Sequence, residues 1–175
     1  MGGRVALHFA AAYPTKVRRL ILESASPGLA TEAERLGRQA NDEALACEIE
    51  SHGVREFIRR WESLPLFESQ LQLPNPVRAK RHAQRLRNTE AGLASALRGL
   101  GTGALPSLWE ALPSIQTRTL IIAGELDTKF VEIGEQMTAV LPEAQLCIVP
   151  GAGHTVHLER PRHWVKVVAE FMYST

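Results

Sequence analysis

The stretch TLIIAGELD, from Thr119 to Asp127, decides the fold of this chain together with QLCIVPGAGH, from Gln145 to His154. Each stretch begins with an apolar run, which is typical of a strand buried on both faces of a parallel sheet. Each then turns at glycine and reaches a titratable side chain. Because the carboxyl ends of the strands form the ligand crevice of an open α/β sheet, we expect Asp127 and His154 to face one site.

These two residue types have a specific chemistry when they lie side by side. The aspartate can accept the Nδ1–H hydrogen bond of the histidine, fix the ring tautomer and stabilise the imidazolium that forms during proton transfer. Taken alone, Asp127 would be interpreted as a helix cap and His154 as a turn residue. Their occurrence at the ends of successive strands predicts a catalytic pair instead.

Helical patterns follow both strands, over residues 131–141 and 161–173. Toward the N-terminus, residues 17–23 predict a further strand, and residues 5–13 are apolar on nearly every face, which predicts a buried helix. Strands that alternate with helices form parallel sheets through right-handed crossovers. The sequence therefore predicts an α/β core.

The predicted core is interrupted by residues 27–112, a segment rich in Arg, Glu and Ala. The two pieces of the core are therefore expected at residues 1–26 and 113–175. We interpret the segment between them as a helical lid over the carboxyl ends of the strands. A separate helical domain without catalytic relevance is the alternative. The helices predicted within it cover residues 31–50, 54–61, 76–88 and 92–100.

One predicted lid helix carries a high density of positive charge. Such a run is usually a solvated helix face, but it could also line a site for an anion. Its basic residues are Arg78, Lys80, Arg81, Arg85 and Arg87.

The chain as a whole is nearly neutral, with 20 Lys and Arg against 19 Asp and Glu. That balance gives no general reason to expect nucleic acid or a membrane as a partner, and no apolar stretch of about 18 residues predicts a transmembrane helix. Cys47 and Cys147 match no metal spacing, so we expect neither a metal nor an organic cofactor. The same cysteine usage makes the cytoplasm the expected location.

The two chemistry-bearing stretches are similar to the acid and histidine regions of the α/β-hydrolase fold family, in which a catalytic Ser, Asp and His follow one another along the chain. Gly124 to Asp127 resembles the acid turn, and Gly153-His154 resembles the histidine region. Met1-Gly2-Gly3 resembles the end of the family's G-x-S-x-G nucleophile turn. The resemblance implies the C-terminal part of this fold, beginning just after the serine, with the Met1 backbone N–H as an oxyanion-hole donor.

A narrower resemblance is to the synthases that form 2-succinyl-6-hydroxy-2,4-cyclohexadiene-1-carboxylate in menaquinone biosynthesis. It rests on LESASPGL (22–29), the W…PLF segment (61–67), RLRN (85–88) and GHTVH (153–157). It implies a substrate with three carboxylates that loses a proton from its succinyl side chain and expels pyruvate. Arginine suits such a substrate because it binds carboxylates bidentately. The residues that the resemblance assigns to this polycarboxylate are Arg4, Arg38, Trp61 and Arg87.

Ser24 and Ser26 follow the first predicted strand, but no G-x-S-x-G surrounds them, and Pro27-Gly28 predicts a turn. We therefore do not expect either serine to be the nucleophile. We also expect the 175-residue chain alone to lack appreciable synthase activity. His8 and His157 are interpreted as packing or positioning residues.

Several alternatives stay open at the level of sequence. A general esterase or carbon–carbon bond hydrolase of the same fold would not need the arginines. A non-catalytic hydrolase-like module that binds a small acid or a partner protein would not need the serine. Within the lid, Trp61 equally fits a core position, and Arg87 is one of several neighbouring basic residues.

Overall fold

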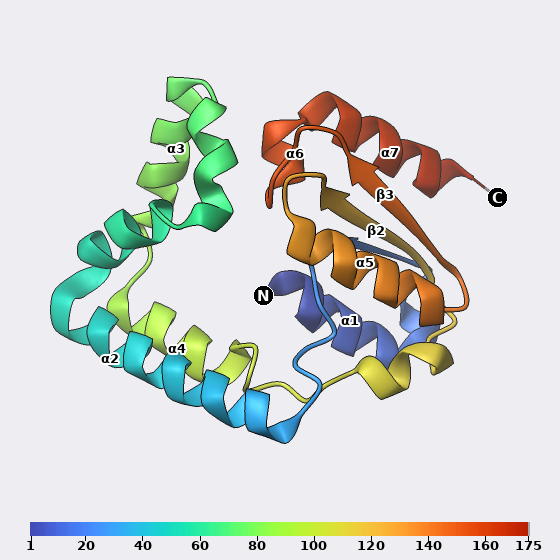
Figure 1. Cartoon of the computed structure of the whole chain (residues 1–175), viewed down its shortest axis with the longest axis horizontal. Coiled ribbons are helices and arrows are strands. Elements are labelled where there is room, and N and C mark those ends of the chain that lie inside the picture. The colour runs from blue at the N-terminus through green and yellow to red at the C-terminus, as the bar shows by residue number, and fades with distance from the viewer. Residues whose placement is uncertain (175) are drawn as a thin grey trace. The chain divides into compact units, whose positions relative to one another are not determined.

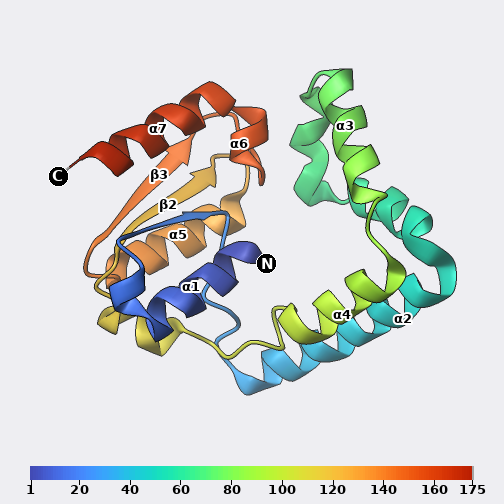
Figure 2. The ribbon, with the colours of Figure 1, turned by 180° about the vertical axis from the view of Figure 1, so that it is seen from behind.

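Three strands form one parallel sheet in the order β1 (Arg19–Glu23), β2 (Arg118–Gly124), β3 (Ala144–Val149). The computed structural model, which describes residues 1–174, places β1 beside β2 at one edge of this sheet (Figure 2). In the register, Leu22 lies opposite Ile121, and Ile121 lies opposite Leu146. The central strand is buried almost throughout because it is paired on both sides and covered on both faces. The predicted parallel α/β core is confirmed.

Helices cover both faces of the sheet (Figure 1). On one face, α1 (Gly2–Ala12) and α5 (Thr128–Val140) bury an apolar cluster that includes Leu7, Leu22 and Met137. On the other face, the short α6 (Val156–Glu159) and α7 (Pro161–Tyr173) bury a second cluster around Ile122 and Phe171. Ile121 and Ile122 belong to different clusters because successive strand side chains point to opposite faces.

Helix α1 is less buried than its sequence predicts. One face of it, with Leu7 and Ala10, is fully buried against the sheet. The opposite face exposes Val5, Phe9 and Tyr13, of which Phe9 and Tyr13 stack with ring centroids 5.0 Å apart. The prediction of a helix buried all round was therefore wrong. Apolar residues on every face do not bury a helix when the described elements cover only one face of it.

The segment between β1 and β2 is helical: α2 (Glu32–Glu62), the 3₁₀ segment η2 (Pro65–Gln72), α3 (Asn75–Arg85) and α4 (Glu90–Leu100). Thr31 and Glu34 form a capping box at the start of α2, with both reciprocal hydrogen bonds present. Gly53, at φ 83°, breaks the helical geometry inside α2, close to the gap predicted between residues 50 and 54. The segment η2 was not predicted.

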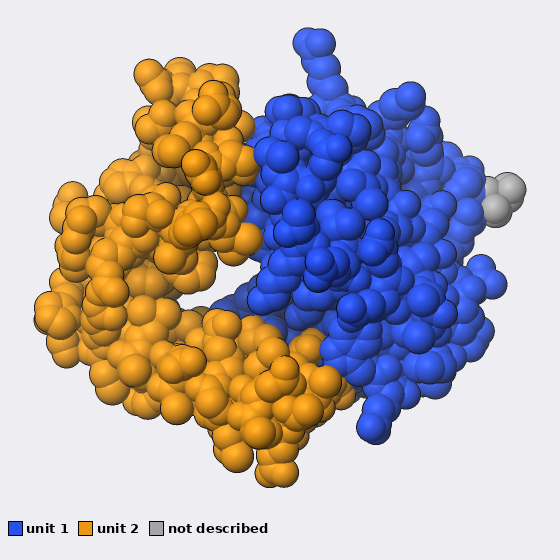
Figure 3. Space-filling model, in the orientation of Figure 1, with its two compact units in different colours: residues 1–27, 108–175 blue, residues 28–107 orange. Residues whose placement is uncertain are grey.

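The chain divides into two compact units (Figure 3). Unit 1 comprises Met1–Pro27 and Leu108–Thr175, and unit 2 comprises Gly28–Ser107. The sequence placed the end of the insertion later, at residue 112. Two further 3₁₀ segments, η1 (Pro14–Lys16) and η3 (Trp109–Ser114), belong to unit 1. Residues 108–112 group with unit 1 because Leu112 is fully buried in the α1–α5 cluster.

Within residues 1–174, no helix combines the length and the apolar character needed to span a bilayer.

Candidate active site

Asp127 and His154, predicted from successive strand ends, form a hydrogen bond in unit 1. The Asp127 carboxylate accepts it from Nδ1 of His154 at 2.7 Å. An ionised carboxylate can only accept hydrogen bonds, so Nδ1–H of His154 is the donor in this pair. The side chain of Asp127 is only 5 % exposed, whereas that of His154 is 23 % exposed. The buried member therefore orients the member that reaches solvent.

The competing interpretation of Asp127 as a helix cap fails on geometry. Asp127 does occupy the N-cap position of α5, but its side chain makes no capping hydrogen bond there. Its carboxylate points to the histidine ring instead.

Backbone hydrogen bonds fasten the acid turn to the histidine loop. Glu125 N–H donates to the Val149 carbonyl at 3.0 Å, and Leu126 N–H donates to the Ala152 carbonyl at 2.9 Å. The Glu125 carboxylate accepts in turn from the backbone N–H of Gly151 at 2.8 Å. These three bonds span two loops that are far apart in sequence, so they fix the separation of Asp127 and His154.

Gly124 allows the two loops to approach this closely. A Cβ atom at Gly124 would overlap the backbone carbonyl oxygens of Ala152 and Gly153. Backbone atoms cannot rotate away as a side chain can, so this position between β2 and Asp127 requires glycine.

The buried carboxylate of Glu159 holds the loop on both sides of His154. It accepts from the Gly153 N–H at 2.6 Å and from the Thr155 N–H at 3.1 Å, and the residue is 8 % exposed. The Phe130 ring meets the His154 ring edge-on at 4.8 Å. Sequence reasoning did not assign a role to either residue. The signal for Glu159 was a charged side chain five residues after the histidine and two residues before Pro161.

A second histidine–carboxylate pair lies where β1 ends. His157 Nδ1 is 2.8 Å from Oε1 of Glu23, the last residue of that strand. The His157 ring also meets Trp164 edge-on at 6.2 Å. His157 therefore ties the histidine loop to β1, as expected of a positioning residue.

Arg4 and Met1 lie together at the start of α1. Arg4 is 6 % exposed, and its backbone N–H donates to the Met1 carbonyl at 3.1 Å. Burial of Arg4 sets it apart from the solvated arginines of the chain, but its role and that of Met1 stay predictions.

The other three predicted substrate residues belong to unit 2. Arg38 is exposed and pairs through Nε with Asp42 at 2.8 Å. Arg87 is exposed in the turn after α3. Trp61 is half-buried, and its ring lies 5.5 Å from the rings of Phe57 and Phe67. Each of the three has different partners within unit 2, and their assignment to a substrate stays a prediction.

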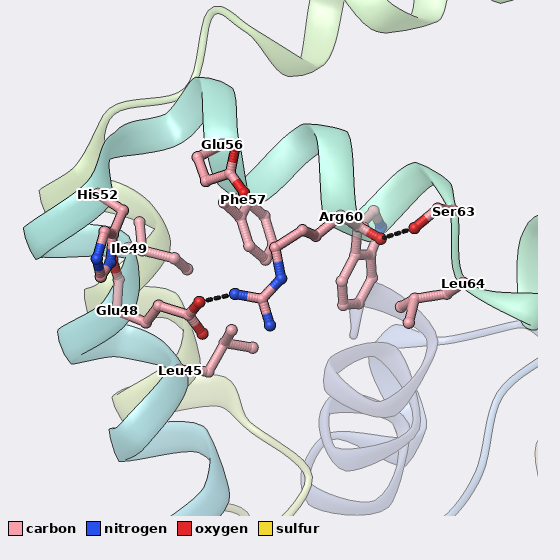
Figure 4. A pocket seen from close by; sticks show the side chains of 10 residues that line it. Leu45, Glu48, Ile49, His52, Glu56, Phe57, Arg60, Ser63 and Leu64 are labelled. Atoms are coloured by element: carbon pink, nitrogen blue, oxygen red, sulfur yellow. Dashed lines mark hydrogen bonds and ion pairs between the residues drawn. The ribbon is translucent and has the colours of Figure 1, made fainter.

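Trp61 lines a cavity of about 330 Å³ formed along α2, on both sides of Gly53 (Figure 4). Leu45, Ile49 and Phe57 supply apolar walls, and an ion pair between Glu48 and Arg60 borders the space. The cavity therefore offers an aromatic and aliphatic surface beside a paired charge.

The described residues contain no set of side chains suited to bind a metal ion. Within residues 1–174, no group of three or more His, Cys, Asp or Glu side chains is arranged to hold a metal ion.

A family model for the alpha/beta hydrolase fold matches residues 1–161. The chain is 46% identical over 174 residues to a putative 2-succinyl-6-hydroxy-2,4-cyclohexadiene-1-carboxylate synthase of Bacillus subtilis (strain 168), which covers 99% of this chain and 64% of that protein.

Solved structures agree with the sequence comparison. The fold is similar to MenH from S. aureus, with a TM-score of 0.94 and 40% identity over 97% of this chain and 64% of that one. It is also similar to a thermophilic esterase from Thermogutta terrifontis with malate bound, with a TM-score of 0.82 and 25% identity over 98% of this chain and 61% of that one. The chain thus spans less than two thirds of the length of each of these three proteins.

Proposed function

The chain belongs to the α/β-hydrolase fold family, and on that premise we propose that it carries the acid and the histidine of a 2-succinyl-6-hydroxy-2,4-cyclohexadiene-1-carboxylate synthase. The observation that carries the proposal is the 2.7 Å hydrogen bond from His154 to the buried Asp127. The 46% identity to the Bacillus subtilis protein supports the choice of synthase within the family.

In the proposed reaction the His154 ring is the proton acceptor. Asp127 keeps the proton on Nδ1, so Nε2 receives the proton that leaves the succinyl side chain of the substrate, relayed through the serine of the triad. The electrons of the broken C–H bond form a new conjugated C=C bond as the C–O bond to the enolpyruvyl group breaks. The departing oxygen keeps the C–O electron pair, and the released enolpyruvate takes up the proton held by His154 and becomes pyruvate. These 175 residues contain no G-x-S-x-G turn, so the proposed activity belongs to a protein in which the pair is combined with such a serine.

The proposed substrate is a small-molecule polycarboxylate with three negative groups. We assign Arg4, Arg38 and Arg87 to its carboxylates and Trp61 to its apolar part. Guanidinium groups bind carboxylates by charge-assisted hydrogen bonds, and the Arg38–Asp42 pair engages only Nε of Arg38. The Met1 backbone N–H is assigned to the oxyanion hole. This reaction calls for no metal or organic cofactor.

Location follows from the same proposal. Cys47 and Cys147 are both free thiols, which fits the reducing cytoplasm that we propose as the site of the reaction.

An ester hydrolase is the second candidate, supported by the similarity to the Thermogutta terrifontis esterase. The same histidine–aspartate pair would then activate a serine for attack on an ester. The two reactions differ in their need for arginine, because an uncharged ester offers no carboxylate to bind.

The test uses a chimera that joins this chain to the residues of the Bacillus subtilis relative that lie outside the match. We expect the chimera to release pyruvate from the tricarboxylate substrate. Asp127→Asn and His154→Ala should each lower kcat by about 10³–10⁴-fold, because either change removes the oriented base. His163→Ala, an exposed histidine on α7, is the matched control and should leave kcat unchanged.

Arginine variants separate the two candidates. Arg4→Ala and Arg87→Ala should raise KM for the tricarboxylate while leaving the hydrolysis of a neutral ester unaffected. A chimera that hydrolyses neutral esters but releases no pyruvate would favour the esterase and overturn the synthase.

A further inference from the structure

A small cavity of about 150 Å³ lies within unit 2, between η2, α3 and the end of α2. Three arginines of α3 line it: Arg78, Arg81 and Arg85. The positive run of residues 78–87 is therefore not a uniformly solvated face. Part of it borders a partly open space between α3, η2 and the end of α2.

The charge inside this cavity is unbalanced in favour of cations. Glu62 supplies the one carboxylate among its lining residues, against three guanidinium groups. That carboxylate is already engaged, by Arg85 at 2.8 Å and by His82 at 2.9 Å. Desolvation opposes its ionisation, but the hydrogen bonds from Arg85 and His82 prevail and keep the pKa of Glu62 below its usual value. The Glu62 carboxylate is thus paired with Arg85 and His82.

The remaining walls are apolar or amide in character. Phe67 and Gln70 are 7 % and 8 % exposed, and the Arg85 guanidinium lies over the Phe67 ring at 5.5 Å. Arg78 donates from Nη1 to the Leu71 carbonyl at 3.3 Å, which holds its head group at the cavity. Guanidinium groups beside an aromatic wall suit a planar anion with an apolar stem, since charge and apolar surface lie next to each other.

We propose that this cavity binds a small carboxylate, with its anionic group between Arg78 and Arg81 and its apolar part against Phe67. Sites for larger organic ligands occupy about 300 Å³ or more, so a volume of about 150 Å³ fits an acid of only a few carbon atoms. A guanidinium fork matches the two oxygens of a carboxylate, and the apolar wall favours a carboxylate over a phosphate ion. This inference does not depend on the proposed synthase reaction.

The experiment titrates the 175-residue chain with propionate and, separately, with inorganic phosphate, while NMR follows the arginine Nε–H signals. We expect propionate to shift the Arg78 and Arg81 signals in a saturable way and to bind more tightly than phosphate. Arg81→Gln and Arg78→Gln should each weaken propionate binding by about tenfold or more, because each removes a charge-assisted hydrogen bond. Lys80→Gln removes the same charge from the same helix outside the cavity and should leave the affinity unchanged.

Each other outcome has a definite meaning. Absence of saturable shifts at Arg78 and Arg81 would overturn the site, and so would equal weakening by Lys80→Gln. Phosphate binding as tightly as propionate would overturn the carboxylate class. Arg78 is exposed, so Arg78→Gln keeps the test valid even if Arg81→Gln disturbs α3, which circular dichroism would reveal.

Discussion

Other residues besides Asp127 hold His154 in place. Asp127 fixes the ring through Nδ1, and Glu159 fixes the backbone on both sides of the residue. The edge of the Phe130 ring closes a further side. The ring is therefore oriented before any ligand arrives, which is the condition for an efficient proton acceptor.

Replacement of Glu159 tests this arrangement at the level of one residue. Glu159→Ala would leave the buried N–H groups of Gly153 and Thr155 without their acceptor, at about 1–3 kcal/mol each. Glu159→Gln keeps one acceptor oxygen and should destabilise less. Urea unfolding followed by circular dichroism measures both effects. Glu135→Ala, on the exposed side of α5, should stay within about 0.5 kcal/mol of the wild type. A loss for Glu159→Ala no larger than for Glu135→Ala would refute the role of Glu159.

At the scale of single residues, the sequence predicted the pair of Asp127 and His154 but not the contacts that hold the histidine loop in place. Asp127 and His154 were visible because each follows a strand, and strand ends converge in a parallel sheet. Glu159 was visible only as part of a motif, because its partners are backbone N–H groups that leave no mark in the sequence.

At the scale of elements, the separation of the acid turn and the histidine loop depends on Gly124. Gly124→Ala should lower the free energy of unfolding by roughly 1–3 kcal/mol or more, because the new methyl group overlaps two backbone carbonyl oxygens. Gly37→Ala is the matched change in α2, where a Cβ atom meets nothing within 4 Å. It should instead stabilise by up to about 1 kcal/mol, since alanine favours the helix. Chemical denaturation measures the free energy of unfolding of both variants. A change of the same sign in Gly124→Ala and Gly37→Ala would contradict this account.

Helices α2 and α4 are joined by an exposed ion network centred on Arg98. Its guanidinium donates to Glu43 at 2.8 Å and to Glu50 at 2.6 Å. The hydrogen bond from Arg98, followed by that from Cys47, lowers the pKa of Glu43 from 4.5 to about 2, and Arg98 also lowers the pKa of Glu50. Because both folded pKa values are depressed, the stabilisation is present above pH 4.5 and disappears as the pH falls toward 2.

The network therefore predicts a pH-dependent difference between variants. At low salt, Arg98→Gln should be less stable than the wild type at pH 5, and the gap should narrow as the pH falls through 3 and close toward pH 2. Urea unfolding at several pH values measures it. Arg55→Gln, an exposed cation on α2, should show no such closing gap. A difference for Arg98→Gln that stays constant with pH would rule out the two carboxylates as its cause.

Sequence patterns predicted the long elements better than the short ones. The three strands and α5, α7 and α4 followed from periodicity, and the gap predicted between residues 50 and 54 contains Gly53, where α2 breaks. The 3₁₀ segments η2 and η3 did not follow from periodicity, because three residues per turn leave no amphipathic pattern of useful length. The burial of α1 failed for a different reason, since burial depends on which elements cover a helix and not on its composition alone.

For the molecule as a whole, the division into two units has a physical basis. The two apolar clusters that cover the faces of the sheet consist entirely of residues from unit 1. Unit 2 has buried residues of its own, including Ala46, Ile49 and Ala94 on α2 and α4. Each unit therefore contains buried apolar residues of its own, and such burial stabilises a fold.

Excision of unit 2 tests this division. The Leu108 N–H donates to the Pro27 carbonyl at 2.9 Å, so the two ends of unit 1 already lie within hydrogen-bonding distance. A Gly-Ser-Gly linker can join Pro27 to Leu108 without strain, because each extended residue spans about 3.3–3.6 Å. We expect the shortened chain to unfold cooperatively and to keep the near-ultraviolet signal of Trp109 and Trp164. Inserting the same linker before Gly28 in the full chain is the control for the altered junction.

The same excision separates structure from the proposed chemistry. The shortened chain retains every contact that holds His154 to Asp127 and Glu159, so the Nδ1 proton of His154 should still be detected by NMR. In the chimera, however, the excision removes Arg38, Trp61 and Arg87 and should abolish pyruvate release from the tricarboxylate. Loss of cooperative unfolding would show that unit 1 depends on unit 2. Retained pyruvate release would show that the proposed substrate residues of unit 2 are not needed, and would leave the buried Arg4 as the anion-binding residue of the site.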